Sequence, residues 1–194
     1  MRQSQYSLVK ILLTVLLPAA LLAEETLYDG GQFQILVPKG FVAQPILERE
    51  GHATHVFILG IENRLASMIQ ISTFPPNPNL EFRNSDDIRR ACVVGVDQHF
   101  MSFKRQRSNF HSSDLENIEI DGLAGVKATW TADFEGSGLM PMLPEKGILY
   151  VVADEFGFLS IRATGDESSF DTITLRAAKA IDTMTIDRPN KEAR

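Results

Sequence analysis

The chain of 194 residues contains a single cysteine, Cys92. One cysteine excludes an internal disulfide framework and any cysteine-rich structural zinc site. Long blocks of lysine and arginine are also missing, and the 25 acidic residues outnumber the 19 basic ones, for a formal net charge of -6. Such a chain is poorly suited to neutralising nucleic-acid phosphates. We therefore expect no nucleic-acid partner.

The sequence lacks the common motifs of catalysis and of nucleotide binding. Neither Gly-x-Gly-x-x-Gly nor a P-loop occurs in it. Gly136-Ser137-Gly138 does not match the Gly-x-Ser-x-Gly elbow, and the Ser-x-x-Lys match from Ser7 to Lys10 falls in the N-terminal segment. Paired carboxylates such as Asp86-Asp87 and Glu24-Glu25 lie at a predicted helix start and near the start of the predicted domain, where solvated charge is expected. We predict that the protein is not an enzyme and binds no cofactor.

The histidines and the cysteine do not suggest a metal site. His52 and His55 are three residues apart, a spacing that suits zinc on a helix, but the local pattern is that of a strand, where they point to opposite faces. His99 lies near the apolar face of a predicted helix, and His111 lies in the loop after it. Cys92 occupies an apolar helix position and is predicted to be a buried thiol. No metal ligands are predicted.

Residues 1–23 have the layout of a secretory signal peptide. The charged opening with Arg2 and Lys10 precedes the uncharged apolar run Ile11–Leu22, which ends at Ala23. This run is shorter than the about 20 residues of a transmembrane helix. We predict cleavage and a single domain, 24–194, in the periplasm or outside the cell, without a membrane span; an uncleaved anchor is the alternative. Without Arg2 and Lys10, 17 basic and 25 acidic residues remain, a net charge of -8.

Hydrophobic periodicity predicts an α+β domain. Alternating apolar residues predict strands at Phe33–Val37, His55–Ile61, Leu65–Thr73, Leu115–Ile120, Val126–Phe134, Ile148–Ala153 and Phe158–Thr164. Apolar residues at three- and four-residue spacing predict a helix from Ser85, its expected cap, to Phe103, and a closing helix after its expected cap Ser168, with Asp171 as a near relative of a capping box. The predicted fold is a largely antiparallel sheet of about six or seven strands packed against two main helices, like an α/β/α sandwich.

Three stretches of the chain carry a resemblance to a known family. They are FQILVPKGF at Phe33–Phe41, IEIDGLAGVK at Ile118–Lys127, and GFLSI at Gly157–Ile161 before a helix that contains Phe170. In this order they resemble the PsbP-like/DcrB superfamily, over roughly Leu27 to Asp187. The resemblance implies a small α/β/α sandwich that acts mainly by binding other proteins. It supplies no catalytic or cofactor-binding residue.

The segment Glu135–Gly147 is the strongest candidate for a partner-binding surface in the sequence. Its glycines and prolines argue against regular structure, yet Leu139, Met140, Met142 and Leu143 are apolar. Such residues either fold back as a lid over the sheet edge or contact a partner, and methionine adapts well to a binding surface. We predict that these four residues belong to a protein-recognition surface.

These observations leave three functional hypotheses. The first is a non-enzymatic periplasmic binding or adaptor protein with an envelope or secreted protein partner. The second is a periplasmic immunity protein, whose acidic surface would steer it to a basic toxin. The third is a small-molecule carrier or hydrolase with a cavity between sheet and helix. Trp130, Phe134 and Tyr150 are its candidate wall residues, although they fit a core more simply.

Overall fold

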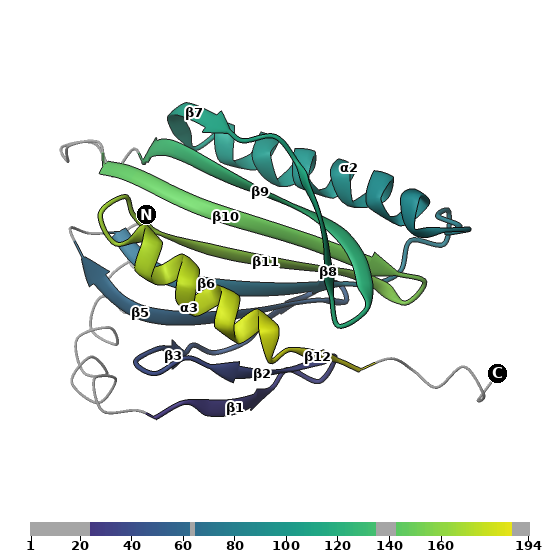
Figure 1. The fold of residues 1–194 in the computed structure, drawn as a ribbon, viewed down its shortest axis with the longest axis horizontal. Coiled ribbons are helices and arrows are strands. Elements are labelled where there is room, and N and C mark those ends of the chain that lie inside the picture. Colours follow the sequence, from purple (N-terminus) through teal and green to yellow (C-terminus); the bar gives the residue numbers. More distant parts are fainter. Residues whose placement is uncertain (1–23, 63–64, 135–142, 188–194) are drawn as a thin grey trace, which may run out of the picture.

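The computed structural model of the chain describes residues 24–62, 65–134 and 143–187. Its strands are β1 (Thr26–Asp29), β2 (Phe33–Val37), β3 (Val42–Ala43), β4 (Leu47–Arg49), β5 (His52–Glu62), β6 (Leu65–Phe74), β7 (Arg107–Ser112), β8 (Glu116–Ile120), β9 (Leu123–Phe134), β10 (Leu143–Asp154), β11 (Gly157–Asp166) and β12 (Thr185–Ile186). Its helices are α2 (Ser85–Lys104) and α3 (Phe170–Asp182). The predicted α+β class is confirmed (Figure 1).

The described strands form one large sheet and one small sheet. The large sheet has nine strands in the order β3-β5-β6-β11-β10-β9-β7, with β4 paired to β5 and β8 to β9. The small sheet has the order β1-β2-β12. All of these pairings are antiparallel, both those between consecutive strands such as β10 and β11 and those between strands far apart in the chain such as β6 and β11. The sheet is larger than predicted because short strands extend both of its edges.

The two helices pack on opposite faces of the large sheet. On the central strand β10, alternate side chains point to opposite sides. Ile148, Tyr150 and Val152 belong to the core that contains Ile173 and Ala177 of α3. Leu149, Val151 and Ala153 belong to the core that contains Cys92 and Val96 of α2. This arrangement is the predicted α/β/α sandwich; Figure 1 shows α2 along β9 and β10, and α3 in front of β6 and β11.

The N-terminus of α2 differs by one residue from the sequence prediction. Asn84, in extended conformation, is the cap, and its side chain accepts hydrogen bonds from the backbone N–H groups of Asp86 and Asp87, both at 2.9 Å. Ser85, the predicted cap, is already helical. The prediction was wrong because asparagine and serine cap equally well and the two are adjacent.

The start of α3 also differs from the prediction. Ser169 occupies the cap position, and its side chain makes no capping hydrogen bond. The hydroxyl of Ser168, the predicted cap, instead donates to Asp166 Oδ1 at 2.5 Å. Asp171 therefore has no capping box to complete. The turn before α3 is held by the Asp166 carboxylate rather than by a serine cap.

Strand β10 begins earlier than the sequence pattern indicates. The predicted irregular segment was Glu135–Gly147, but residues 143–147 are already paired with β9, with Leu143 opposite Phe134. Pro144 does not prevent this because it lies at the start of the strand, one residue before the pairing with β11 begins at Glu145. Residues 135–142 lie outside the described part of the chain.

Two further observations bear on how the chain is placed in the cell. In the part of the chain that the structure describes, no helix has the length and apolar character of a membrane span. Residues 1–23 lie outside that part. The signal peptide and the 24–194 domain boundary therefore stay predictions.

Candidate binding groove beside helix α2

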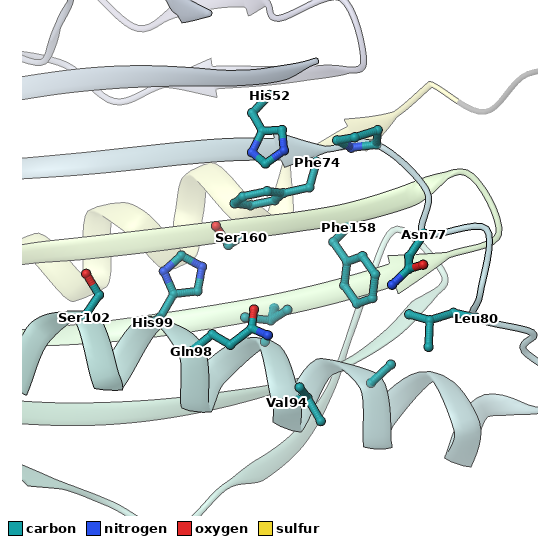
Figure 2. A pocket seen from close by; sticks show the side chains of 14 residues that line it. His52, Phe74, Asn77, Leu80, Val94, Gln98, His99, Ser102, Phe158 and Ser160 are labelled. Carbon is teal, nitrogen blue, oxygen red and sulfur yellow. The ribbon is translucent and has the colours of Figure 1, made fainter. Parts of the chain in front are cut away.

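A groove opens between α2 and the part of the sheet that this helix does not cover. Helix α2 packs against β9 and β10. On the same side of the sheet, β11, β6 and β5 extend beyond the helix, and a cavity of about 540 Å³ lies between them and α2 (Figure 2). This volume is within the range of small-molecule sites in proteins. The groove is the leading candidate for a functional site among the described residues.

The floor of the groove comes from alternate residues of neighbouring strands. Phe74 of β6 and Phe158 and Ser160 of β11 line the cavity. Their neighbours Ile71, Leu159 and Ile161 point to the opposite face and pack under α3. Because side chains alternate along a strand, both faces of these strands carry apolar groups, but only the α3 face is fully covered. The floor thus combines the half-buried rings of Phe74 and Phe158 with the buried side chain of Ser160.

The α2 wall is shaped by small residues. Ala91 and Gly95 of α2 face the cavity, together with Val151 of β10. A Cβ atom at Gly95 would lie 3.4 Å from the Val151 side chain, so the glycine leaves space beside the strand. Larger residues at these two positions would narrow the cavity.

Two histidines flank one phenylalanine across the groove. The ring of Phe74 lies 5.0 Å from that of His52 on β5 and 6.2 Å from that of His99 on α2, both in edge-to-face orientation. Figure 2 shows the three rings spanning the groove from β5 to the helix. Burial lowers the pKa of His99, and the positive charge of Arg162 lowers it further. His99 is therefore a neutral imidazole at pH 7, able to donate and accept hydrogen bonds.

His52 and His55 point to opposite faces of the sheet, as the strand pattern predicts. His55 is buried, and its Nδ1 lies 2.9 Å from the hydroxyl of Tyr28 on the small sheet. Desolvation lowers the pKa of His55, with a smaller opposing effect from Glu48. Within the described residues, no group of three or more His, Cys, Asp or Glu side chains is placed to hold a metal ion.

Three charged residues lie along the same face, on the β7 side of the groove. Arg107 Nε donates to Glu145 Oε2 at 2.5 Å, and both side chains are buried. Arg162 of β11 donates to Gln70 Oε1 at 2.6 Å. The Phe103 ring of α2 lies between the two arginines, 5.0 Å from the guanidinium of Arg107 and 5.1 Å from that of Arg162.

Exposed apolar side chains border the groove on its solvent side. Leu80, Val94 and Met101 are 41%, 56% and 55% exposed, and we call these three residues the rim patch. Leu80, in the segment between β6 and α2, and Val94 of α2 both line the cavity. Val94 and Met101 are seven residues apart and thus share one face of α2. Exposed apolar residues gathered beside a cavity are typical of an interaction site.

The structure describes only one of the four residues predicted to contact a partner. Leu139, Met140 and Met142 lie outside the described residues. Leu143 is half-buried at the start of β10. Eight residues separate it from Val151 in the groove, about 26 Å along the strand. The groove is therefore a second candidate surface, distinct from the predicted one.

Other sequence predictions concern the interior. Cys92 is buried, and burial raises the pKa of its thiol to about 12. Trp130 and Tyr150, weighed as cavity walls, are core residues on opposite faces of the sheet. A cavity between sheet and helix does exist, but other residues line it. No local sequence pattern indicates this cavity, because β6 and β11 each carry a single phenylalanine on the α2 side, Phe74 and Phe158.

Comparison with known proteins identifies the architecture. No protein-family model matches the chain, and no curated protein matches its sequence. The solution structure of the cyanobacterial PsbP protein (CyanoP) of Synechocystis sp. PCC 6803 is similar to it, with a TM-score of 0.56, 14% identity, and coverage of 84% of this chain and 92% of that one. The chain has a PsbP-like fold. The predicted resemblance is thus confirmed for the fold.

Two other solved structures share this PsbP-like architecture. LpqN of Mycobacterium tuberculosis, described as involved in cell envelope biogenesis, has a TM-score of 0.52 and 14% identity, covering 84% of this chain and 91% of LpqN. A protein from Bacteroides thetaiotaomicron has a TM-score of 0.50 and 13% identity over 84% of this chain. The match spans 48%, about half, of the Bacteroides protein. At these identities the likeness concerns the fold alone.

Proposed function

We propose that this chain is a non-enzymatic binding domain of the cell envelope that holds a protein partner against the rim patch. The observation that carries the proposal is the gathering of exposed apolar side chains beside an open groove. Burying them against a partner would gain about 25 cal/mol per Å² of apolar surface removed from water. The PsbP-like fold is compatible with this role, since function lies in sites rather than in the fold.

An extracytoplasmic location is part of this proposal. It is supported by the predicted signal peptide, in which the uncharged run Ile11–Leu22 follows a charged opening. The similarity to LpqN, described as involved in cell envelope biogenesis, agrees with it. We propose the periplasm or the cell exterior as the site of action.

The charges around the rim patch are mixed. Glu81 and Asp97 are exposed beside it, and so are Arg83 and Arg90, which line a second cavity together with Leu80 and Val94. The preference for a basic partner rests instead on the net charge of -8 predicted for residues 24–194, which would speed association with a positively charged protein. An immunity protein bound to a basic toxin is the narrower form of this proposal.

The four residues Leu139, Met140, Met142 and Leu143 remain a proposed second contact. Because Leu143 lies about 26 Å along β10 from the groove, one partner would have to be large to reach both surfaces. Separate variants at the two places can therefore assign the contact.

The experiment is affinity capture with the chain from Glu24 to Arg194. The wild type is compared with a Leu80→Asp/Val94→Asp variant, with a variant carrying serine at Leu139, Met140, Met142 and Leu143, and with Leu175→Asp as the matched control. Leu175 is 61% exposed on α3, on the opposite face of the sheet. Envelope extract is applied at low and moderate salt, and retained proteins are identified by mass spectrometry.

We expect one protein to be retained in stoichiometric amount by the wild type and by Leu175→Asp, and lost with Leu80→Asp/Val94→Asp. Retention should weaken at higher salt because charge steering is screened. If only the serine variant fails to retain the protein, the contact is made by Leu139, Met140, Met142 and Leu143 instead of the rim patch. If the wild type and its three variants all retain the same protein in equal amount, the result contradicts a specific contact at either surface.

A further inference from the structure

The groove beside α2 is lined without aspartate, glutamate, lysine or arginine among the described residues, although these four types make up 23% of the chain. Its polar lining consists of neutral amides and hydroxyls, such as Gln98 and Ser160, together with the imidazoles of His52 and His99. Arg162, two residues beyond Ser160 on β11, is not part of the lining. A charged ligand would therefore lose water here without meeting an opposite charge.

Two neighbouring cavities differ from the groove in this respect. The first shares Leu80 and Val94 with it and has two acidic and two basic lining residues, Glu81, Asp87, Arg83 and Arg90. The second shares Phe74 and Phe158 with it and has three acidic lining residues, Asp154, Glu155 and Asp187. The lack of charge is thus a property of the groove itself and not of the surface around it.

The groove has aromatic rings on its floor and small residues on its helical wall. Phe74 of β6 and Phe158 of β11 are half-buried, so part of each ring is available for contact. Ala91 and Gly95 lie one turn apart on the same face of α2 and carry no side chain larger than a methyl group. A flat ring has room to lie against this wall. Contacts between aromatic rings are favourable beyond the area that they bury.

Neutral hydrogen-bonding groups lie at one end of the groove. Figure 2 shows His99, Ser102 and Ser160 at this end, with Phe158 toward the other. The Ser160 side chain is buried, and His99 is half-buried. Burial and the charge of Arg162 lower the pKa of His99, so its imidazole is neutral at pH 7. A hydroxyl or amide of a ligand would find both donors and acceptors here.

We propose that the groove binds an uncharged aromatic compound that carries a hydroxyl or a similar neutral polar group. The ring would lie between Phe158 and the small residues of α2, and the polar group would form hydrogen bonds with His99 and Ser160. The cavity of about 540 Å³ has room for a bicyclic ligand. This ligand is separate from the protein partner proposed for the rim patch, and its binding does not require that partner.

The test compares three naphthalenes of similar size that differ in charge. 1-Naphthylmethanol is uncharged, 1-naphthoate is anionic, and 1-naphthylmethylammonium is cationic. Each is titrated at pH 7.5 into the nitrogen-15-labelled chain from Glu24 to Arg194, and changes in the amide NMR signals give both the dissociation constant and the location of the site. Using both charged ligands separates the effect of the groove from that of the net charge of the chain, which would favour the cation.

Two pairs of variants test the place of the ring. Ala91→Phe fills the groove, and Leu175→Phe on the opposite face of the sheet is its matched control. Phe158→Leu removes an aromatic ring from the groove while keeping an apolar side chain. Its matched control is Phe110→Leu, because Phe110 is a half-buried ring in the core under α2 that does not line the groove. Thermal unfolding of each variant checks that it is folded.

We expect the wild type to bind 1-naphthylmethanol about tenfold or more tightly than either charged ligand, because the groove matches neither charge. The amide signals of Gly95 and Phe158 should shift, and that of Leu175 should not. Ala91→Phe should abolish binding. Phe158→Leu should weaken it about two- to tenfold, the equivalent of one aromatic contact. The two control variants should bind as the wild type does.

A charged naphthalene that binds as tightly as 1-naphthylmethanol would overturn the proposal, as would binding that survives Ala91→Phe. Signal changes confined to residues outside the groove, or none at the solubility limit of 1-naphthylmethanol, would overturn it too. The comparison of the three ligands with the wild type decides even if Ala91→Phe does not fold. None of these results depends on capture of a protein by the rim patch, so the two proposals can fail separately.

Discussion

At the scale of single residues, two glycines show how tightly the α2 side of the sheet is built. Gly147 of β10 lies opposite Trp130 of β9, and a Cβ atom there would overlap the indole ring. The ring thus lies over the glycine backbone. Gly95 of α2 is different, because its added Cβ would make a contact of 3.4 Å with Val151.

We predict effects of opposite sign for alanine at these two positions. Gly147→Ala should lower the free energy of unfolding by about 1–3 kcal/mol because it overpacks a closed site. Gly95→Ala should raise it by about 0.5–1 kcal/mol, since glycine is unfavourable inside a helix. Urea unfolding of the two variants and the wild type measures both changes. An unchanged midpoint for Gly147→Ala would show that the indole can move aside at no cost.

At the scale of elements, the start of α2 depends on one side chain. Asn84 accepts hydrogen bonds from two backbone N–H groups that otherwise have no partner in the helix. We predict that Asn84→Ala lowers the free energy of unfolding by about 1 kcal/mol. Ser85→Ala is the neighbouring control, and its effect should be much smaller. Chemical denaturation measures both, and a larger loss with Ser85→Ala would return the cap to that serine.

Elements with their own apolar pattern were predictable from sequence, and the others were not. Strand β7 (Arg107–Ser112), where a loop with His111 was predicted, has six residues of which only Phe110 is apolar. The helices and the strands β2, β5, β6, β8, β9, β10 and β11 follow from their own apolar periodicity. Strands such as β3 (Val42–Ala43) and β12 (Thr185–Ile186) have two residues each, and pairing with a neighbouring strand defines them instead. The groove was missed for a related reason. The groove exists because α2 covers only part of the sheet. The residues around Phe74 and Phe158 do not predict how far the helix extends over the sheet.

At the scale of the whole molecule, two histidines, the buried His55 and the half-buried His99, connect stability to pH. His55 lies on the α3 side and His99 on the α2 side, and burial is the main cause that lowers the pKa of each. Their ordinary pKa is 6.5. In the unfolded chain they take up protons at higher pH than in the folded one, so acid favours unfolding.

We predict that stability is constant with respect to these two groups above about pH 6.5 and falls as the pH drops below it, through the lowered pKa values of the folded state. Urea midpoints at pH 7.5 and pH 5 measure the change. A His55→Gln/His99→Gln variant should show a smaller difference between the two pH values than the wild type does. If the variant and the wild type respond equally, other groups carry the acid sensitivity.

Strand β10 separates the two cores and supplies alternate side chains to both of them. Its neighbours β9 and β11 hold it in register on both sides. Inserting or deleting one residue near Leu149 would therefore send every later side chain of the strand to the wrong core. The number of residues in the strand therefore matters as much as their identity, because it decides which core each side chain enters. During evolution its residues can be exchanged one for another, but its length can change only by two residues at a time or at its ends.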